Sequence, residues 1–178
     1  MADSKKLVPF ILSWETDKYT NNKKDKGGPT KYGITLATWR RVGYDKNGDG
    51  VLNEEDVKLL TKDDFHRVFK QNFWNACKAD KIQDQSVANM LVDFAYNSGV
   101  KRAATYLQLT LGITADGIIG NKTLFAINKS NGKRLFERFK KTREDYLKSI
   151  AKGAQKDFLV GWLRRVSYIT YGHLKLNE

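Results

Sequence analysis

The sequence has few cysteines, prolines and histidines, and each scarcity excludes a class of feature. Cys77 is the single cysteine of the 178 residues, so no disulfide bond can form within the chain, and its place on an expected helix indicates a core residue rather than a nucleophile. Pro9 and Pro29 are the only prolines, which favours helices joined by short connections. The two histidines, His66 and His173, are far apart and lack the spacing of metal ligands.

Long hydrophobic runs are also missing. No stretch approaches the roughly 20 apolar residues of a transmembrane helix, so we expect no membrane-spanning segment. The apolar run at residues 7–14 is short, and no small-residue cleavage site follows it, so we expect no secretory signal peptide. If the substrate lies outside the cytoplasm, the chain must therefore reach it by another export route.

The chain is strongly basic, with a formal net charge of +12. This charge favours a polyanionic partner, which could be nucleic acid, an anionic membrane surface or a bacterial wall rich in carboxylates and phosphates. No recognition motif interleaves lysine and arginine with base-stacking aromatics, so we expect no nucleic-acid partner. Hydrophobic residues make up 40% of the chain, which suffices for the core of one compact domain, with or without a small helical addition.

Apolar residues recur at helical spacing along most of the chain, which predicts an all-α fold with no strand of any length. Ser4 is expected to cap a first helix whose inward face carries Leu7, Ile11 and Glu15. The segment 85–97 is apolar on most sides, so it is the expected central buried helix. Further helices are expected to begin near Thr35 and near Thr61, where Thr61 and Asp64 fit a capping box. Helices are also expected to cover residues 101–111, 124–127, 131–152 and a last segment with Phe158, Trp162 and Val166.

Glu15 ends the first apolar helix face, where burial would raise the pKa of its carboxyl group. Cleavage of a glycosidic bond needs such a protonated acid beside the leaving oxygen, and usually a second carboxylate to activate water or stabilise the transition state. Trp14 and Tyr19 could supply an apolar wall, and the polar loop that follows returns Asp25 and Thr30. The other interpretation of Glu15 is a partly buried glutamate paired with a lysine.

Two glycines in this loop would let the chain turn tightly and let a sugar approach its backbone. The N-terminal pattern is Glu15-x-x-x-Tyr19, followed by Asp25-x-Gly27-Gly28-x-Thr30 and Gly33-Ile34-Thr35. This pattern resembles the N-terminal signature of glycoside hydrolase family 108, whose members are bacterial and phage N-acetylmuramidases, some of them labelled secretion activator proteins. Three later segments, 85–99, 115–124 and 158–166, are similar to the family's central helix, its peptidoglycan-binding-like module and its C-terminal helix.

The resemblance implies a lysozyme-like helical fold and hydrolysis of the glycan bond that follows N-acetylmuramic acid in peptidoglycan. It implies a catalytic region over residues 1–98 and a packed, peptidoglycan-binding-like helical module over 99–178. Glu15 falls on the family's catalytic glutamate, and Asp25 and Thr30 match residues that position or activate the water. In that arrangement the product is inverted, and the two carboxyl groups lie roughly 6.5 to 9.5 Å apart.

The chain departs from the family pattern within this loop. The usual Glu-Gly-Gly-Tyr is one residue longer here, and the proline before the glycine pair is Lys26. Asp17, within the longer segment, is therefore a rival second carboxylate. The alternative roles are an Asx-turn for Asp25 and a turn or helix cap for Thr30.

Residues 45–56 fit the calcium-binding loop of an EF-hand at several positions. Side-chain oxygens stand at loop positions 1, 3 and 5, glycine at position 6 permits the bend, and an acid stands at position 12. That acid is an aspartate, which is shorter than the usual glutamate, so we expect a reduced affinity. We expect a structural Ca²⁺ here and no cofactor for catalysis, and the alternative is a metal-free turn. The predicted ligands are Asp45, Asn47, Asp49, Val51 and Asp56.

Tyr96 and Asn97 end the expected central helix, at a position that faces the cleft in lysozyme-like folds. We expect them to bind substrate together with Tyr19 and Gly28. Asn97 could hydrogen-bond an N-acetyl group, and its alternative role is a helix C-cap. Asp93, one turn earlier on a mostly apolar helix, is expected to be a buried acid bound to a structural partner.

The sequence therefore predicts a monomeric lysozyme-type hydrolase that acts on peptidoglycan glycan strands. We expect it to be made in the bacterial cytoplasm and to act in the periplasm or cell wall, either as a phage endolysin or in association with secretion. The rival hypothesis is a non-catalytic peptidoglycan-binding or secretion-accessory protein. The two hypotheses differ in whether Glu15 matters for activity.

Overall fold

The computed structural model describes residues 1–21 and 28–177. This part of the chain is mostly α-helical, which confirms the predicted fold class. The first half contains a 3₁₀ turn η1 (Ser4–Lys6), α1 (Val8–Leu12), β1 (Thr30–Lys31), β2 (Ile34–Thr35), α2 (Leu36–Val42), α3 (Glu54–Lys58), α4 (Lys62–Phe69), the π-helical turn η2 (Lys70–Trp74) and η3 (Ala79–Lys81).

The second half is formed by longer helices and ends in a second short hairpin. It contains α5 (Gln85–Ser98), α6 (Val100–Leu111), α7 (Asn121–Lys129), α8 (Gly132–Ile150), η4 (Gly153–Gln155), α9 (Lys156–Ser167), β3 (Ile169–Thr170) and β4 (His173–Leu174). Among the described residues, none of these helices is both long enough and apolar enough to cross a lipid bilayer.

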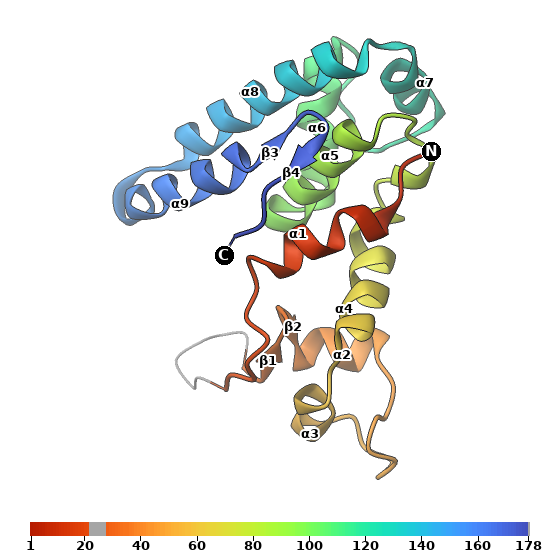
Figure 1. Cartoon of the computed structure of the whole chain (residues 1–178), viewed down its shortest axis with the longest axis vertical. Helices are drawn as coiled ribbons and strands as arrows, with labels where there is room; N and C mark the ends of the chain where they lie inside the picture. The colour runs from red at the N-terminus through yellow and green to blue at the C-terminus, as the bar shows by residue number, and fades with distance from the viewer. Residues whose placement is uncertain (22–27, 178) are drawn as a thin grey trace.

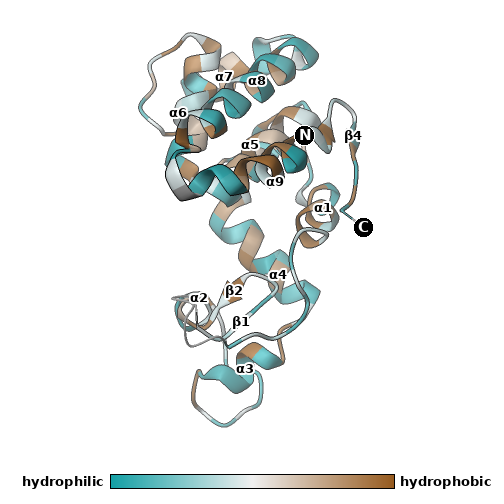
Figure 2. Ribbon diagram, turned by 90° about the vertical axis from the view of Figure 1, so that its left-hand side faces the viewer, coloured by the Kyte–Doolittle hydropathy of each residue, from teal (hydrophilic) through white to brown (hydrophobic). Residues whose placement is uncertain are grey.

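The elements gather into two parts joined by α4 (Figure 1). We call α5 to α9 with β3 and β4 the helical body, and β1, β2, α2 and α3 the hairpin lobe. Helix α1 lies at the junction, beside the helical body, and the chain then descends into the hairpin lobe (Figure 1). The view turned by 90° shows the same division, with α4 between the two parts (Figure 2).

Helix α5 forms the centre of the helical body. Its residues 86–95 are all buried, and it packs against α6 and α8. A helix that is apolar on most sides can be stable only when other elements surround it, so the predicted central helix is confirmed. Asp84 caps its N-terminus by accepting a hydrogen bond from the backbone N–H of Val87 (3.0 Å).

The N-terminal helix differs from the prediction. Asp3, and not Ser4, caps the first turn, because the Ser4 hydroxyl is hydrogen-bonded to His66 Nε2 (2.9 Å). Helix α1 ends at Leu12, and the backbone N–H groups of Trp14 and Glu15 bond three residues back, as in a tightened last turn. Glu15 therefore stands just beyond the helix rather than on its face.

Two short hairpins correct the expectation of a fold without strands. β1 and β2 pair antiparallel, and the two turn residues between them, Tyr32 (φ 52°) and Gly33 (φ 71°), both have positive φ, as a type I′ turn requires. β3 and β4 also pair antiparallel. Strands of two residues are too short for an alternating pattern to show in the sequence.

A buried ion cluster ties three helices of the helical body together. Asp93 on α5 contacts Arg143 on α8 (Oδ2 to Nη2, 2.7 Å) and Arg165 on α9 (Oδ1 to Nη2, 2.7 Å). Burial alone would raise the pKa of Asp93, but the two guanidinium groups outweigh it and hold that pKa below its usual value. The expected structural partner of Asp93 is thus a pair of arginines.

The turn between α6 and α7 is organised around one side chain. The Gln108 amide donates to Asp116 Oδ1 (2.7 Å), to the Ile118 carbonyl (3.0 Å) and to Thr123 Oγ1 (3.1 Å), and its oxygen accepts from Gly117 N–H (2.8 Å). The motif at residues 115–124 therefore has a structural role, because its polar residues satisfy a buried glutamine.

Candidate active site

A cleft of about 550 Å³ opens between the hairpin lobe and the junction of α4 with α5. One wall comes from the hairpin and α2, and the other from α4, η2 and the C-terminal end of α5. Glu15 lies between them, immediately after α1. The residues that line the cleft are Glu15, Gly33, Ile34, Thr38, Arg41, Phe65, Val68, Phe69, Asn72, Phe73, Tyr96 and Asn97.

The carboxyl group of Glu15 is partly buried in this cleft. Burial raises its pKa, while a hydrogen bond from the Tyr96 hydroxyl and the positive charge of Arg165 partly oppose the rise. The net direction is upward. A carboxyl group that holds its proton beside a solvent-filled cleft can act as a general acid.

Tyr96 is held in an aromatic cage. The rings of Phe73, Phe69 and Phe65 lie 5.1, 5.8 and 6.4 Å from its ring, measured between centroids. Burial, together with the neighbouring Glu15, raises the pKa of the Tyr96 hydroxyl. The hydroxyl therefore keeps its proton and remains a hydrogen-bond donor to Glu15.

The buried ion cluster lies behind this pair. Arg165 donates from Nε and Nη2 to Asp93 Oδ1 (3.1 and 2.7 Å), and its guanidinium carbon lies 5.8 Å from the centre of the Tyr96 ring. Because α9 supplies Arg165, the C-terminal part of the chain contributes to the electrostatics of a carboxyl group near the N-terminus.

Gly33 brings the hairpin close to the acid. A Cβ atom at this position would lie 2.7 Å from the Tyr96 hydroxyl and 3.0 Å from Glu15 Oε2. The Tyr32 N–H donates to the Thr16 carbonyl (3.1 Å), which anchors the turn to the segment after Glu15. The glycine thus permits both the turn and the close approach.

Polar side chains on both walls of the cleft are available for a ligand. Arg41 and Thr38 come from α2, Asn72 from η2 and Asn97 from the end of α5. Asn97 is exposed, and its amide nitrogen donates to the Asp93 carbonyl (2.7 Å), which orients the side chain. Amide and guanidinium groups next to an aromatic wall suit a ligand rich in hydroxyl and acetamido groups.

The structure brings only some of the predicted site residues together. Glu15, Tyr96 and Asn97 line the cleft. Tyr19 instead donates from its hydroxyl to Glu54 Oε2 (2.8 Å), and Thr30 donates to the Gly28 carbonyl (2.9 Å). In the described part of the chain these three residues are not among those that line the cleft, and their roles in binding or catalysis stay predictions.

The predicted second carboxylate lies outside the described residues. Asp25 falls in the segment 22–27, as do Lys26 and Gly27. The rival candidate, Asp17, is exposed. Thr20 and Thr30, which flank the segment, exchange two backbone hydrogen bonds of 2.9 Å each, so the described ends of the loop are held side by side.

The acidic loop at residues 45–56 is held by hydrogen bonds to its own backbone. Asp45 accepts from Gly48 N–H (2.8 Å) and Gly50 N–H (2.7 Å), and Asp56 accepts from Lys46 N–H (2.6 Å) and Asn53 N–H (2.9 Å). Within the described ranges, no group of three or more acidic, histidine or cysteine side chains gathers as metal ligands. Calcium binding by Asp45, Asn47, Asp49, Val51 and Asp56 therefore stays a prediction.

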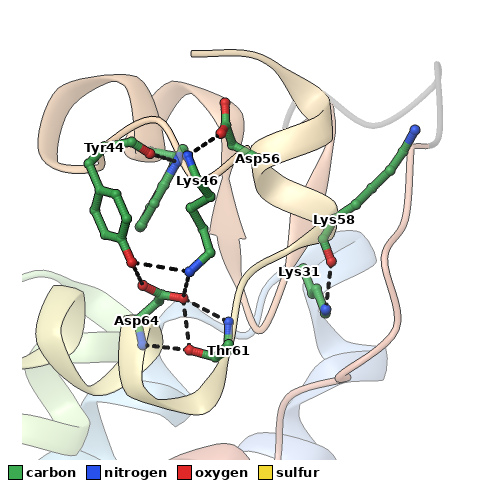
Figure 3. A network of polar contacts seen from close by, with 8 residues as sticks. Lys31, Tyr44, Lys46, Asp56, Lys58, Thr61 and Asp64 are labelled. Atoms are coloured by element: carbon green, nitrogen blue, oxygen red, sulfur yellow. Dashed lines mark hydrogen bonds and ion pairs between the residues drawn. The ribbon is translucent and has the colours of Figure 1, made fainter. Parts of the chain in front are cut away.

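A second polar network fastens this loop to α4 (Figure 3). Lys46 Nζ pairs with Asp64 Oδ2 (2.7 Å), and Tyr44 donates to Asp64 Oδ1 (3.2 Å). Asp64 also accepts from Thr61 N–H (2.9 Å) and completes the capping box that the sequence predicts at the start of α4.

Sequence reasoning missed most of the cleft wall. Phe65, Phe69 and Phe73 follow helical spacing, a pattern that indicates a buried helix face rather than a binding site, yet they line the cleft. Arg41 and Asn72 carried no distinguishing signal, because isolated polar residues on helices usually face solvent. Cys77, in contrast, is buried as predicted, and burial raises the pKa of its thiol to about 12.

Comparisons with known proteins agree with this geometry. The family model described as Glycosyl hydrolase 108 matches residues 8–99, and the model described as Predicted Peptidoglycan domain matches residues 102–167. The solved structure of Brucella abortus SagA is similar to this chain at 34% identity and a TM-score of 0.73, covering 93% of this chain and 90% of that one. A comparison with curated protein sequences gives no match.

Proposed function

Because this chain belongs to the glycosyl hydrolase 108 family, we propose that it cleaves the β-1,4 bond between N-acetylmuramic acid and N-acetylglucosamine in peptidoglycan, with Glu15 as the general acid. The observation that supports this most directly is the position of Glu15 in the cleft, where burial raises its pKa. The family match supports a glycosidase, and the second family match supports peptidoglycan as its partner.

In the proposed reaction, Glu15 protonates the glycosidic oxygen as the bond to the anomeric carbon breaks. Tyr96 orients the carboxyl group through its hydrogen bond, and the surrounding phenylalanine rings hold Tyr96 in place. A general acid in such a position accelerates cleavage by about 10²–10⁴-fold.

A water molecule completes the reaction by adding to the anomeric carbon and giving its proton to a second carboxylate. We propose Asp25 for this role, helped by Thr30, on the family pattern in the sequence. If Asp25 acts on a water at the opposite face of the sugar, its carboxyl group lies roughly 6.5–9.5 Å from that of Glu15 and the product is inverted.

We propose that residues 1–98 supply catalysis and that residues 99–178 hold the enzyme on the wall. The net charge of +12 would favour attachment to a wall that carries carboxylates and phosphates. We further propose that the protein is made in the bacterial cytoplasm and acts in the periplasm or cell wall.

The decisive experiment is digestion of purified peptidoglycan by the wild type and by Glu15→Gln, with mass spectrometry of the released fragments. We expect muropeptides with reducing N-acetylmuramic acid ends from the wild type, and a rate about 10²–10⁴-fold lower from the variant. Glutamine keeps the shape of the side chain but has no acidic proton, so both proteins should have the same melting temperature.

The rival function is a non-catalytic peptidoglycan-binding or secretion-accessory protein. It predicts that the wild type pellets with the wall and releases no fragments. In that case Glu15→Gln would pellet equally well, and the catalytic proposal would be wrong.

A further inference from the structure

A second, smaller pocket of about 240 Å³ lies beside the cleft, between the C-terminal end of α5, helix α8 and helix α9. Asn97 lines both the cleft and this pocket, so the two sites adjoin each other. Neither the glycosidase family nor the proposed acid accounts for the pocket, because its other lining residues lie between residues 98 and 165.

The pocket is lined by three arginines, Arg102, Arg143 and Arg165, and by no acidic side chain among the described residues. Asp93 lies beneath two of them and neutralises one positive charge. The local balance of these four groups is therefore +2. A small concave site with this balance attracts an anion and disfavours a cation.

The hydrogen bonds that the arginines make and leave unmade also favour an anion in this pocket. Arg143 is 2% exposed, and its Nε has no hydrogen-bond partner in the described part of the chain. A buried donor without a partner is rare and costly, so a ligand or water that reached this guanidinium group would gain a hydrogen bond.

Arg102 is the exposed member of the three. Its guanidinium group lies 5.5 Å from the centre of the Tyr146 ring, and its one hydrogen bond within the described chain is a long one to the Ser98 carbonyl (3.4 Å). Stacking on an aromatic ring fixes the guanidinium plane and leaves its edge available for two parallel hydrogen bonds to an oxyanion.

We propose that this pocket binds a carboxylate of the peptide stem attached to the glycan strand that occupies the cleft. A peptide stem projects sideways from the sugar chain and carries free carboxylates, and Trp162 on the pocket wall offers it an apolar surface. This inference rests on the proposed function only in taking peptidoglycan as the ligand. The helical body would then bind the peptide stem in addition to placing Tyr96 beside Glu15.

The test is calorimetric binding of a soluble N-acetylglucosaminyl-N-acetylmuramyl tetrapeptide. This fragment lacks the bond that the enzyme is proposed to cleave, so binding is measured independently of catalysis. We expect Arg102→Ala to weaken binding about 10-fold, as for loss of a charge-assisted hydrogen bond. Arg102→Lys should restore binding only in part, because a lysine has no planar pair of donors.

The matched control is Arg134→Ala, which removes the same charge from an exposed position on the first turn of α8, away from the pocket. Its affinity should equal that of the wild type. The same fragment with amidated carboxylates should bind the wild type about as weakly as the intact fragment binds Arg102→Ala. Since Arg102 is exposed, the melting temperatures of all variants should agree.

Two outcomes would overturn the proposal. Equal affinities of Arg102→Ala and Arg134→Ala would show that the pocket does not contribute to binding. Displacement of the fragment by inorganic phosphate at an equal concentration would assign the pocket to phosphate rather than to the peptide stem. Neither outcome depends on whether Glu15→Gln abolishes hydrolysis, so failure here and failure of the catalytic proposal can be told apart.

Discussion

The ionisation of Glu15 depends on neighbours with opposing effects. Burial raises the pKa of its carboxyl group, the Tyr96 hydroxyl and Arg165 lower it, and the charge of Asp93 raises it again. The first effect is the largest, so the carboxyl group is protonated to a higher pH than an exposed glutamate would be. If Glu15 is the general acid, as proposed, each of these neighbours shifts the pH range of activity.

Replacing Tyr96 with phenylalanine should move the alkaline limb of the pH–rate profile to higher pH. The hydroxyl donates to the ionised carboxylate and so lowers the pKa of Glu15. Its removal raises that pKa further, and the acid keeps its proton over a wider range. The measurement is kcat/KM on peptidoglycan as a function of pH.

The control for this variant is Tyr171→Phe, whose hydroxyl bonds to Asp84 (2.7 Å) on another face of the helical body. Its profile should match the wild type. A shift of the Tyr96→Phe profile to lower pH would mean that the hydroxyl stabilises the protonated acid instead.

Replacing Gly33 with alanine should reduce activity much more than stability. The added Cβ would press on the Tyr96 hydroxyl and on Glu15 Oε2. Displacement of an acid by about 1 Å can lower the rate about 10²-fold. The positive φ of 71° should cost a further 1–2 kcal/mol of folding free energy, roughly as for any left-handed residue.

Gly112→Ala separates these two effects. Gly112 has a φ of 72°, and nothing lies within 4 Å of its added Cβ. Urea denaturation should therefore show a similar loss of stability for both variants, while only Gly33→Ala loses activity. Equal activities would show that the close approach of the hairpin to the acid is not needed.

At the scale of elements, a turn and a loop, neither of which shows a helix or strand pattern in the sequence, position the candidate site. The β1–β2 turn places Gly33 against the acid, and the acidic loop fastens α3 to the start of α4 through Lys46 and Asp64. For Asp64, burial alone would raise the pKa, but the Lys46 and Thr61 hydrogen bonds outweigh it and lower that pKa. Charged and capping interactions thus add to the buried apolar side chains of this lobe, Ile34, Trp39 and Val57.

The acidic loop gives a prediction about calcium. We expect weak Ca²⁺ binding, with a Kd of about 10⁻⁴–10⁻³ M, because the position-12 acid is the short Asp56 and its oxygens accept backbone N–H groups. Calorimetric titration of the wild type measures the constant, and the double variant Asp45→Asn, Asp49→Asn should give no binding heat. Absence of heat from the wild type would establish a metal-free turn.

At the scale of the whole molecule, one continuous core joins the two sequence regions. The buried cluster runs from Leu7 in the first turns through α5 to Val166 and Ile169 near the C-terminus. The Asp93 cluster crosses the same boundary, because α5 belongs to the first region and α8 and α9 to the second. The proposed catalytic region, residues 1–98, therefore shares its hydrophobic core with residues 99–178.

Replacing Asp93 with asparagine should destabilise the fold by about 3–5 kcal/mol, because two buried guanidinium groups would lose their counter-charge. The lowered pKa of Asp93 means that its contribution is fully present above its unfolded-state pKa, and is lost as pH falls through its folded-state pKa. Urea denaturation at neutral and acidic pH should therefore show a difference from the wild type that shrinks in acid.

The matched control is Asp145→Asn on α8, whose carboxylate makes an exposed pair with Lys141 (3.3 Å). Its stability should stay close to that of the wild type at either pH, since solvent screens an exposed pair. A small effect of Asp93→Asn at neutral pH would show that the cluster is replaceable by neutral hydrogen bonds.

The sequence by itself determined the features that depend on neighbours along the chain. The apolar pattern predicted α5, the Thr61 capping box predicted the start of α4, and the motif around Glu15 singled out a glutamate that the structure places in the cleft. Each of these is local, because a helix or a cap is formed by residues within a few positions of one another. The end of α1 and the two-residue strands were missed because so few residues define them.

Only the tertiary structure decided which distant residues meet. Tyr96 hydrogen-bonds to Glu15 although 81 positions separate them, and Gly33 lies close to both side chains. Asp93 pairs with Arg143 and Arg165 out of the many basic residues of the chain. No periodicity encodes such pairs, since they follow from how the helices pack. Glu15 could thus be proposed as the acid from the sequence, whereas its environment, and the arginine pocket beside the cleft, depend on the packing of α5 against α8 and α9.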